Sequence, residues 1–209
     1  DLARSLDTLQ AMAAELDAEI SVLREADGKQ GRVAQVLVRK LPSSLEEYPD
    51  VRIAVCGQVD SGKSSLVGVL TGNGALDNGR GLARAQVFSH RHEIDSGRTS
   101  AVSQQIMGFG TDGRVINYTG VRNMSWTDIV ERSTKLTSLF DHAGHEEYLK
   151  TTVFGLAGHA IDYCLLVVNA NMGSILRMCK EHLQIALALK LPIFVVVTKI
   201  DLAPPNIYE

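Results

Sequence analysis

The sequence predicts an α/β fold in which a mostly parallel sheet is covered by helices on both faces, with a small α+β module in front of it. Short apolar strands alternate with helical segments along most of the chain, a pattern typical of parallel sheets. A glycine-bearing loop at 57–64 joins one of these strands to a helix, and polar motifs follow two later strands. Since such sheets bind ligands at the carboxyl ends of their strands, the loop and the motifs mark the expected site.

The composition is that of an ordinary globular protein. Of the 209 residues, 45% are hydrophobic and 22% are charged, and the formal net charge of −3 gives no general attraction to nucleic acid. Cys56, Cys164 and Cys179 form no C-x-x-C pair, so neither a disulfide framework nor a zinc site is predicted. The longest apolar stretches are only as long as strands. We expect a cytoplasmic protein without a membrane segment, and a monomer.

Residues 1–45 are expected to form a module of their own. Apolar residues recur at three- and four-residue spacing up to about Leu16, which predicts an amphipathic helix. Two short strands, predicted at 20–24 and 32–39, flank a polar turn. Residues 42–50 hold two prolines, two serines and three acidic residues, the composition of a linker. We therefore expect a helix–hairpin module that ends in a linker.

Residues 46–209 are expected to form the main domain. The segment 72–100 is rich in glycine and charge and too long for an idle connector, so it is interpreted as a functional loop. The other expected elements are strands at 51–56, 101–109, 115–118, 136–140, 163–168 and 193–197, and helices near 62–70, 125–133, 146–156 and 176–190.

Residues 57–64 match the phosphate-loop pattern G-x-x-x-x-G-K-[ST]. Glycines let the backbone curl so that successive N–H groups point at one phosphate chain, and the following helix directs its positive end at the anion. Lys63 adds charge beside the β- and γ-phosphates, and Ser64 offers a hydroxyl to Mg²⁺. The motif alone indicates only a nucleoside triphosphate. The residues expected to bind it here are Gly57, Val59, Asp60, Ser61, Gly62, Lys63, Ser64 and Ser65.

A D-x-x-G motif, Asp141 to Gly144, comes directly after the strand predicted at 136–140. Asp141 can there reach Mg²⁺ through water, and the Gly144 N–H can face the γ-phosphate. Taken alone the motif is weak, because Asp and Gly are common turn residues. The next residue, His145, would lie at the mouth of the γ-phosphate site, where an imidazole can orient an attacking water. The simpler alternative is a solvated histidine at a helix start.

Thr198, Lys199 and Asp201 follow the last predicted strand. A carboxylate at this point can accept two hydrogen bonds from the N1–H and the exocyclic amine of guanine, and adenine offers no matching pair of donors. If these three residues are considered alone, the simpler interpretation is a turn at the end of a strand that contains a lysine. Behind a phosphate loop in a parallel sheet, the motif predicts selection of GTP over ATP by Asp201.

Together these motifs resemble a translational GTPase of the elongation-factor-Tu class, because His145 and Tyr148 follow the D-x-x-G motif and the P-loop carries Val59 and Asp60. More narrowly, the sequence resembles the GTP-binding protein 1 and 2 family over nearly the whole chain, least in the first 45 residues. This resemblance implies a P-loop NTPase G domain. The motifs that carry it are LDNGRG at 76–81, HEI at 92–94, SGRTS at 96–100, GHE at 144–146 and YLKTTVFG at 148–155.

The resemblance implies roles that the residues alone do not reveal. Thr99 matches the switch I threonine that senses Mg²⁺ and the γ-phosphate, Asp60 a carboxylate near a monovalent cation, and Val59 one wing of a hydrophobic gate before the histidine. Two positions depart from the pattern. Arg98 stands where the other wing is usually isoleucine, and Thr198 stands where most GTPases have an asparagine amide that braces the P-loop. The chain is also expected to be a fragment, truncated before the last strand and helix of the domain.

The expected function is a switch that binds GTP and GDP, depends on Mg²⁺ and hydrolyses GTP. The resemblance implies a ribosome or another RNA–protein assembly as the partner. The residues expected to be catalytic are His145, Lys63 and Thr99, and those expected at the metal are Ser64, Thr99 and Asp141.

Two alternatives stay open. One is a scaffold that holds GTP without useful hydrolysis, with Arg98 keeping His145 away from the nucleotide. The other is a nucleotide kinase, which a base preference for ATP would support. A kinase has no need to combine the D-x-x-G and T-K-x-D motifs, so we favour the GTPase.

Overall fold

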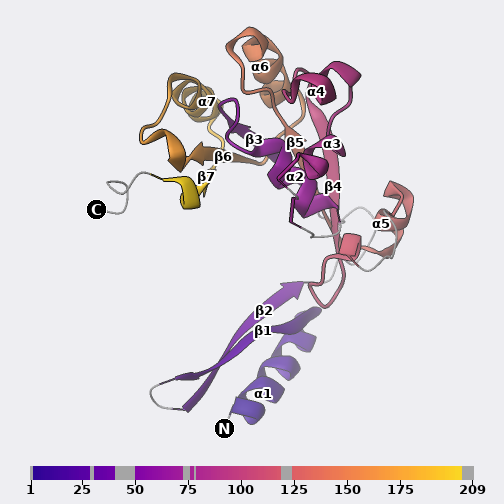
Figure 1. The fold of residues 1–209 in the computed structure, drawn as a ribbon. Coiled ribbons are helices and arrows are strands. Elements are labelled where there is room, and N and C mark those ends of the chain that lie inside the picture. Colours follow the sequence, from indigo (N-terminus) through magenta and orange to yellow (C-terminus); the bar gives the residue numbers. More distant parts are fainter. Residues whose placement is uncertain are drawn as a thin grey trace.

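The computed structural model of the chain contains two sheets, drawn in Figure 1. Among the described residues, one sheet has two strands and the other has five. Apart from Asp50, which begins a strand, the linker predicted at 42–50 lies outside the described residues, as does the domain boundary predicted after residue 45, so the division into domains stays a prediction. The structure describes residues 2–28, 31–40, 50–72, 76–77, 79–118 and 124–203.

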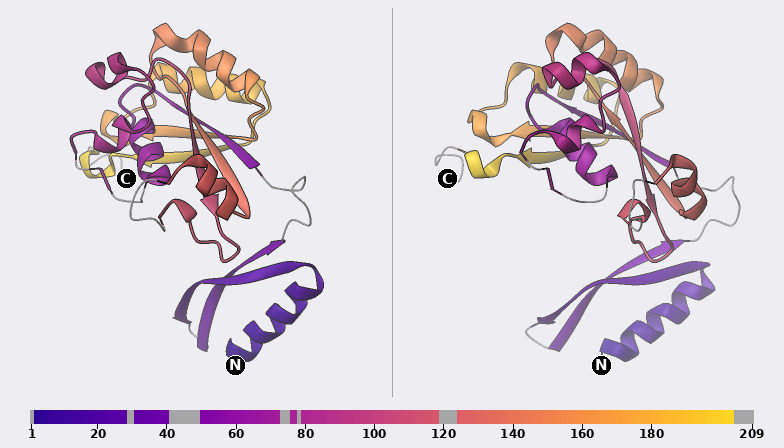
Figure 2. Two further views of the ribbon diagram at one scale, coloured as in Figure 1. Left: turned by 90° about the vertical axis from the view of Figure 1, so that its right-hand side faces the viewer. Right: turned by 45° about the vertical axis from the view of Figure 1, so that its right-hand side comes forward.

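The N-terminal part is a helix followed by a hairpin, as predicted. Helix α1 (Leu2–Glu15) contacts both β1 (Ala18–Gly28) and β2 (Gly31–Lys40), which pair antiparallel. Figure 2 shows the twisted ribbon of the hairpin with the helix beside it. Both strands are longer than predicted, because the ladder continues through exposed polar residues to the pair of Gly28 and Gly31. Such residues carry no apolar periodicity that would indicate a strand.

The larger sheet is mostly parallel, which confirms the predicted fold class. Its strand order is β4-β5-β3-β6-β7, with β4 antiparallel to β5 and the other neighbours parallel. Parallel neighbours need crossover connections, which the alternation of strands and helices provides. The strands are β3 (Asp50–Gly57), β4 (Ser103–Phe109), β5 (Lys135–Asp141), β6 (Tyr163–Asn169) and β7 (Ile193–Thr198).

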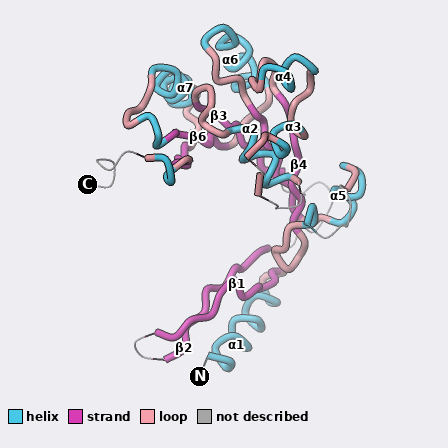
Figure 3. Tube along the Cα trace, in the orientation of Figure 1, coloured by secondary structure: helices cyan, strands magenta, loops and turns pink. Residues whose placement is uncertain are grey.

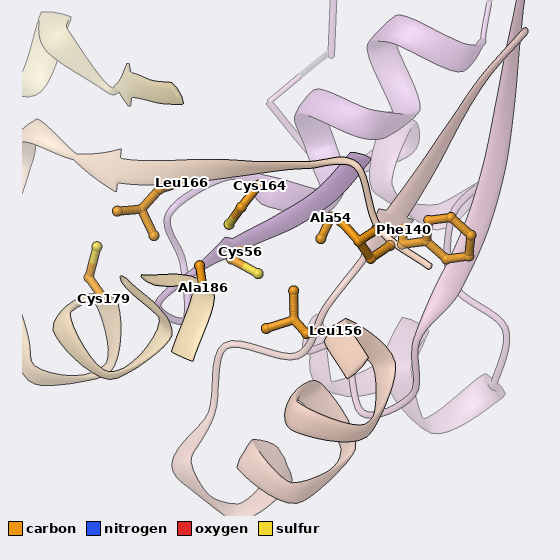
Figure 4. Close-up of a cluster of buried hydrophobic side chains, with 9 residues drawn as sticks. Ala54, Cys56, Phe140, Leu156, Cys164, Leu166, Cys179 and Ala186 are labelled. Carbon is orange, nitrogen blue, oxygen red and sulfur yellow. The ribbon is translucent and has the colours of Figure 1, made fainter. Parts of the chain in front are cut away.

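One face of the sheet is covered by α6 (Leu149–Gly158) and α7 (Arg177–Ala188). Ala54 and Cys56 of β3 point to this face and join a buried apolar cluster. Figure 4 shows side chains of both helices turned toward the strands. The buried members of the cluster are Ala54, Cys56, Phe140, Leu156, Ile161, Cys164, Leu166, Cys179 and Ala186.

The opposite face is covered by α2 (Lys63–Thr71). Since successive residues of a strand point to opposite faces, Val55 lies here, packed with Val67 of α2 and with Val87. Helices therefore cover both faces, as predicted. The carboxyl end of β3, where the phosphate loop begins, is held between the two apolar clusters.

The described part of the segment 72–100 contains two short helices, where we predicted a loop. They are α3 (Leu82–Ala85) and α4 (Arg91–Ser96), which Figure 3 shows as cyan turns separated by pink loops. Helices of four and six residues are too short to show an amphipathic period. Helix α3 packs closely on α2, since a Cβ added at Gly68 would lie 2.1 Å from the carbonyl oxygen of Ala83.

The strand predicted at 115–118 is wrong except at Val115, which forms an isolated antiparallel bridge with Phe109. Residues Ile116–Tyr118 form a short 3-10 helix instead. The cause is Asn117, whose buried amide donates hydrogen bonds to the carbonyl groups of Thr71, at 2.8 Å, and Ile106, at 3.0 Å. The Asn117 side chain thus joins the backbone of β4 to that of α2. A strand at 115–118 would not form these hydrogen bonds.

The predicted capping box begins a helix. The Ser125 hydroxyl accepts a hydrogen bond of 3.2 Å from the backbone N–H of Asp128, and α5 spans Trp126–Arg132. The helix predicted near 146–156 begins as a 3-10 turn (Glu146–Tyr148) before α6. Within the described ranges, the helices are all too short or too polar to cross a bilayer.

Candidate nucleotide-binding site

The loop between β3 and α2 has the backbone that a phosphate loop requires. Gly57 and Gly62 have φ angles of 139° and 87°, and Asp60 also lies in the left-handed region with a φ of 59°. A Cβ on Gly57 would lie 2.3 Å from the carbonyl oxygen of Val167, so β6 leaves room for glycine alone at this position. The chain therefore curls between its two glycines just before the first turn of α2.

Lys63 is the first residue of α2, and its side chain is buried. Its ammonium group donates a hydrogen bond of 2.6 Å to the carbonyl oxygen of Gln58. Burial lowers the pKa of Lys63, although the neighbouring Asp141 carboxylate acts to raise it. The lysine is thus held against its own loop, in surroundings of low polarity where a positive charge attracts an anion strongly.

Two side chains outside the motif brace the phosphate loop. The backbone N–H of Gly57 donates a hydrogen bond of 3.0 Å to Nδ1 of His182, a fully buried residue of α7. Thr198, the last residue of β7, donates its hydroxyl to the carbonyl oxygen of Ser61 at 2.7 Å. Sequence reasoning missed His182 and expected Thr198 to remove a brace. The threonine hydroxyl supplies one instead.

Three residues predicted at the metal come together beside Lys63, although they come from distant parts of the chain. The Ser64 hydroxyl donates to Oδ2 of Asp141 at 2.6 Å. The Thr99 hydroxyl lies 2.8 Å from the Ser64 oxygen and donates to the same carboxylate oxygen at 3.2 Å. The other carboxylate oxygen of Asp141, Oδ1, is buried and has no hydrogen-bond partner among the described residues.

The chemistry of this cluster fits a magnesium ion. Burial raises the pKa of Asp141 to about 6, while the charge of Lys63 and the hydroxyls of Ser64 and Thr99 act to lower it. A bound cation would satisfy the unpartnered carboxylate oxygen, and carboxylate and hydroxyl oxygens are ligands that Mg²⁺ prefers. The described residues offer no group of three His, Cys, Asp or Glu side chains that could hold a metal by themselves.

The segment that carries Thr99 is fastened by Glu93, which sequence reasoning missed. The Glu93 carboxylate is almost fully buried and accepts hydrogen bonds from the backbone N–H groups of Ser89 and His90, before α4, and of Ser100, after it. Burial alone would raise the pKa of Glu93, but these hydrogen bonds outweigh it and hold that pKa below its usual range. One carboxylate therefore closes the loop on either side of α4.

Gly144 lies directly against the phosphate loop. A Cβ at this position would be 2.5 Å from the carbonyl carbon of Gln58 and 2.6 Å from Nζ of Lys63. His145 follows, with its side chain 41% exposed and its Nδ1 accepting a hydrogen bond of 3.3 Å from the N–H of Glu147. The structure thus brings Gly144 into the loop and His145 to its rim.

A single pocket joins most of the predicted phosphate and metal residues. Lys199 and Asp201 lie outside its lining, at the carboxyl end of β7, where Lys199 has a φ of 55° and Asp201 is exposed on the 3-10 helix Ile200–Leu202. Sequence reasoning missed Arg84 and Gly97 in the pocket wall. The residues that line it are Val59, Asp60, Gly62, Lys63, Ser64, Ser65, Arg84, Gly97, Arg98, Thr99, Gly144 and His145.

A glycine-bearing loop with a buried lysine, in a mostly parallel sheet, beside a cluster of Ser, Thr and Asp side chains, defines a P-loop nucleotide-binding domain. Comparison with known families agrees with this class. The model of the elongation factor Tu GTP-binding domain matches residues 49–209, and the chain belongs to that family.

Individual relatives support the same assignment. The chain is 50% identical to GTP-binding protein 1 of Xenopus laevis and 48% identical to human GTP-binding protein 2, in both cases over its whole length. It spans 32% and 35% of those two relatives, about a third of their length. The resemblance to the GTP-binding protein 1 and 2 family is therefore confirmed.

A solved structure shows the same fold. The crystal structure of a bacterial selenocysteine-specific elongation factor, EF-Sec, matches 77% of this chain and 22% of its own chain with a TM-score of 0.52. The two sequences are 20% identical over this match, so the likeness concerns the fold alone.

Proposed function

We propose that this chain binds GTP and GDP with Mg²⁺ and hydrolyses GTP as a conformational switch. The observation that carries the proposal is the meeting of Ser64, Thr99 and Asp141 beside the buried lysine of the phosphate loop. Thr99 belongs to the long segment before β4, so a ligand at this cluster contacts both the rigid loop and a segment outside the sheet. That arrangement couples nucleotide chemistry to the position of the segment.

The phosphate chain binds to the backbone N–H groups of the loop 57–64 and to Lys63. The hydroxyls of Ser64 and Thr99, with Asp141 through water, would hold Mg²⁺, which neutralises negative charge on the phosphates when bound. Asp60, exposed in the same loop, is proposed to lie near a monovalent cation. Each of these residues acts on the phosphates, and none of them reads the base.

Guanine is proposed to bind at the carboxyl end of β7. Asp201 accepts hydrogen bonds from the base, and Lys199 packs beside it. Support for this position comes from Thr198, whose hydroxyl ties the end of β7 to the carbonyl oxygen of Ser61. The base-reading motif is therefore fixed relative to the phosphate loop although it lies outside the pocket lining.

For hydrolysis, His145 orients the attacking water, and Lys63 stabilises the charge of the transition state. The rim position of His145, with an exposed imidazole, supports this role because the ring can turn toward a water at the γ-phosphate. Val59, Arg98 and His145 line the same pocket, so the proposed gate around the histidine contains one apolar and one charged residue.

Hydrolysis removes the contacts of Thr99 with the γ-phosphate and its metal, and the released segment changes the affinity for a partner. The family likeness supports a ribosome or another RNA–protein assembly as that partner and a cytoplasmic, monomeric protein. With the catalytic histidine at an exposed rim, intrinsic turnover is slow and the partner accelerates it.

The proposal is tested by displacement of a fluorescent GDP analogue from the full chain, with GDP, ADP and xanthosine diphosphate as competitors, for the wild type and for Asp201→Asn. We expect tight and specific GDP binding in the wild type and a shift toward the xanthine nucleotide in the variant. Equal affinity for ADP, unchanged in the variant, would contradict the proposal and favour a nucleotide kinase.

GTP turnover with a candidate ribosomal partner separates the switch from a non-hydrolysing scaffold. We expect the partner to stimulate GTP hydrolysis by the wild type. In Asp201→Asn, we expect it to stimulate hydrolysis of xanthosine triphosphate instead. Binding of GTP without any turnover, in the presence of a partner that binds only the GTP form, would favour the scaffold.

A further inference from the structure

Arg84 of α3 reaches the wall of the nucleotide pocket from a part of the chain that none of the sequence motifs covers. It lines the same pocket as Lys63, Ser64 and Thr99, and its side chain is half-buried. Helix α3 is fixed to α2 by the close approach at Gly68, so the base of the arginine is anchored to the helix that follows the phosphate loop.

The guanidinium group is held by two glycines with left-handed backbone. A Cβ on Gly81, at the start of α3, would lie 2.5 Å from Nε of Arg84, and a Cβ on Gly97, at the end of α4, would lie 3.2 Å from its Nη2. The guanidinium group therefore lies close to the Cα positions of both glycines. Arg84 bridges the two short helices in the space that side chains at 81 and 97 would otherwise fill.

The carboxylate of Asp77, which interacts with the charge of Arg84, is engaged with backbone groups. Asp77 accepts backbone hydrogen bonds from Gly79, Gly81 and Ala83, which cap the start of α3. These bonds, that of Ala83 above all, with a contribution from the charge of Arg84, hold the pKa of Asp77 below its usual range. Within the described residues, no side-chain ion pair of the Arg84 guanidinium is formed within 4.0 Å.

The neighbouring Arg98 is a weaker candidate for the same position. It lines the pocket as well, but its side chain is exposed, whereas Arg84 is half-buried and held between two backbone surfaces. A guanidinium that is already fixed loses less conformational freedom when it binds an anion. The geometry therefore favours Arg84 over Arg98 as the residue that contacts a ligand.

We propose that Arg84 is a second phosphate-binding cation of the site, beside Lys63, which contacts the triphosphate from the segment 72–100. This inference rests on the proposed GTP site. Because the ammonium of Lys63 comes from the phosphate loop and the guanidinium of Arg84 from α3, the two cations approach the phosphate chain from different elements. The guanidinium of Arg84 lies beside Gly97, two residues before Thr99, so its contact favours the nucleotide that also binds Thr99, which is GTP rather than GDP.

The test compares affinities for GDP and for a non-hydrolysable GTP analogue in the wild type, Arg84→Gln, Arg84→Lys and Arg91→Ala. Glutamine keeps most of the aliphatic part of the side chain but carries no charge. Lysine keeps a positive charge but lacks the planar guanidinium group. Arg91 is an exposed arginine of α4 that does not line the pocket, and it serves as the matched control.

We expect Arg84→Gln to weaken the GTP analogue about tenfold more than GDP, the size of one charge-assisted hydrogen bond, with Arg84→Lys in between and Arg91→Ala like the wild type. An equal loss for both nucleotides, accompanied by a lower melting temperature, would overturn the inference and assign Arg84 a role in joining α3 to α4. Unchanged affinities in a folded variant would overturn it too. A wild type that binds neither nucleotide would overturn the proposed function together with this inference.

Discussion

The backbone N–H of Gly57 donates a hydrogen bond to Nδ1 of His182, across 3.0 Å in space and 125 residues of sequence. This bond places an uncharged imidazole beneath the phosphate loop, since a ring nitrogen that accepts carries no proton. Burial, and then the charge of Lys63, lowers the pKa of His182 to about 4. The phosphate loop is therefore supported by a group that must stay neutral.

The first prediction concerns acid stability. A histidine with a folded pKa of about 4 and an unfolded pKa near 6.5 takes up its proton first in the unfolded chain. Its contribution to the free energy of unfolding is complete above about pH 6.5 and is lost as the pH falls toward 4. His142, whose pKa is also lowered to about 4 by burial, acts in the same direction.

Replacement of His182 by Asn, which keeps an acceptor near the position of Nδ1, should make the fall between pH 7 and pH 4.5 smaller by up to about 3 kcal/mol. Urea unfolding at the two pH values measures this difference. Exposed Gln184 of the same helix provides the control, because Gln184→Asn changes no group that titrates between these pH values and should follow the wild-type profile. Parallel profiles for His182→Asn and the wild type would show that His182 is not responsible.

The second prediction concerns Glu93. In Glu93→Gln, one acceptor oxygen becomes an NH₂ group that faces backbone donors, so buried N–H groups lose their partner. We expect a loss of about 1–3 kcal/mol in the free energy of unfolding, measured by urea titration. The exposed carboxylate in the same helix gives the matched change Asp95→Asn, which should have little effect. Equal stability of the two variants would contradict this account.

The third prediction uses two glycines in helices. A Cβ at Gly68 would clash with the carbonyl oxygen of Ala83 at 2.1 Å, whereas a Cβ at Gly158 would meet its nearest neighbour, in Phe154, at 4.0 Å. Gly68→Ala should therefore push α3 away from α2 and lower the melting temperature. Gly158→Ala should leave it unchanged or raise it, because alanine gains roughly 0.5–1 kcal/mol over glycine in a helix. Thermal unfolding of both variants tests the contrast, and similar shifts would count against the packing described here.

The fourth prediction concerns Thr198. Thr198→Val removes the hydroxyl that binds the carbonyl oxygen of Ser61, so the phosphate loop loses a support worth about 1 kcal/mol. Dissociation of GDP, followed by stopped-flow fluorescence, should become several-fold faster. Thr198→Ser keeps the hydroxyl and should remain near the wild-type rate. If serine and valine behave alike, the methyl group and not the hydroxyl supports the loop.

Much of the fold was predictable because short apolar strands alternate with helical segments, α2 follows directly on the phosphate-loop motif, and α7 is clearly amphipathic. Lys63, Ser64 and Asp141 could be singled out because their motifs have fixed residue types at fixed spacing, whereas Thr99 followed only from the family resemblance. The spacing of the residues alone could not show that Ser64, Thr99 and Asp141 lie in contact, since they meet only through the packing of the sheet.

The residues that sequence reasoning missed support the site from a distance. His182 lies on the buried face of an amphipathic helix, where a core histidine has no special pattern. Glu93 follows His90 at the spacing of a capping box, a signal that could have found it, but histidine is not a usual capping residue. Arg84 sits in a helix of one turn, too short to show which way its side chains point.

Two carboxylates of the segment 72–100, those of Asp77 and Glu93, accept hydrogen bonds from backbone groups of this same segment and not from the sheet. The turns of this segment are therefore stabilised by hydrogen bonds that do not depend on a bound nucleotide. Because α3 packs on α2 and Val87 lies in the core, we expect only the later part of the segment, α4 with Thr99, to approach and leave the phosphates as a preformed body. A body that is already ordered gives up little conformational entropy on docking, so most of the interaction energy of Thr99 remains available to distinguish GTP from GDP.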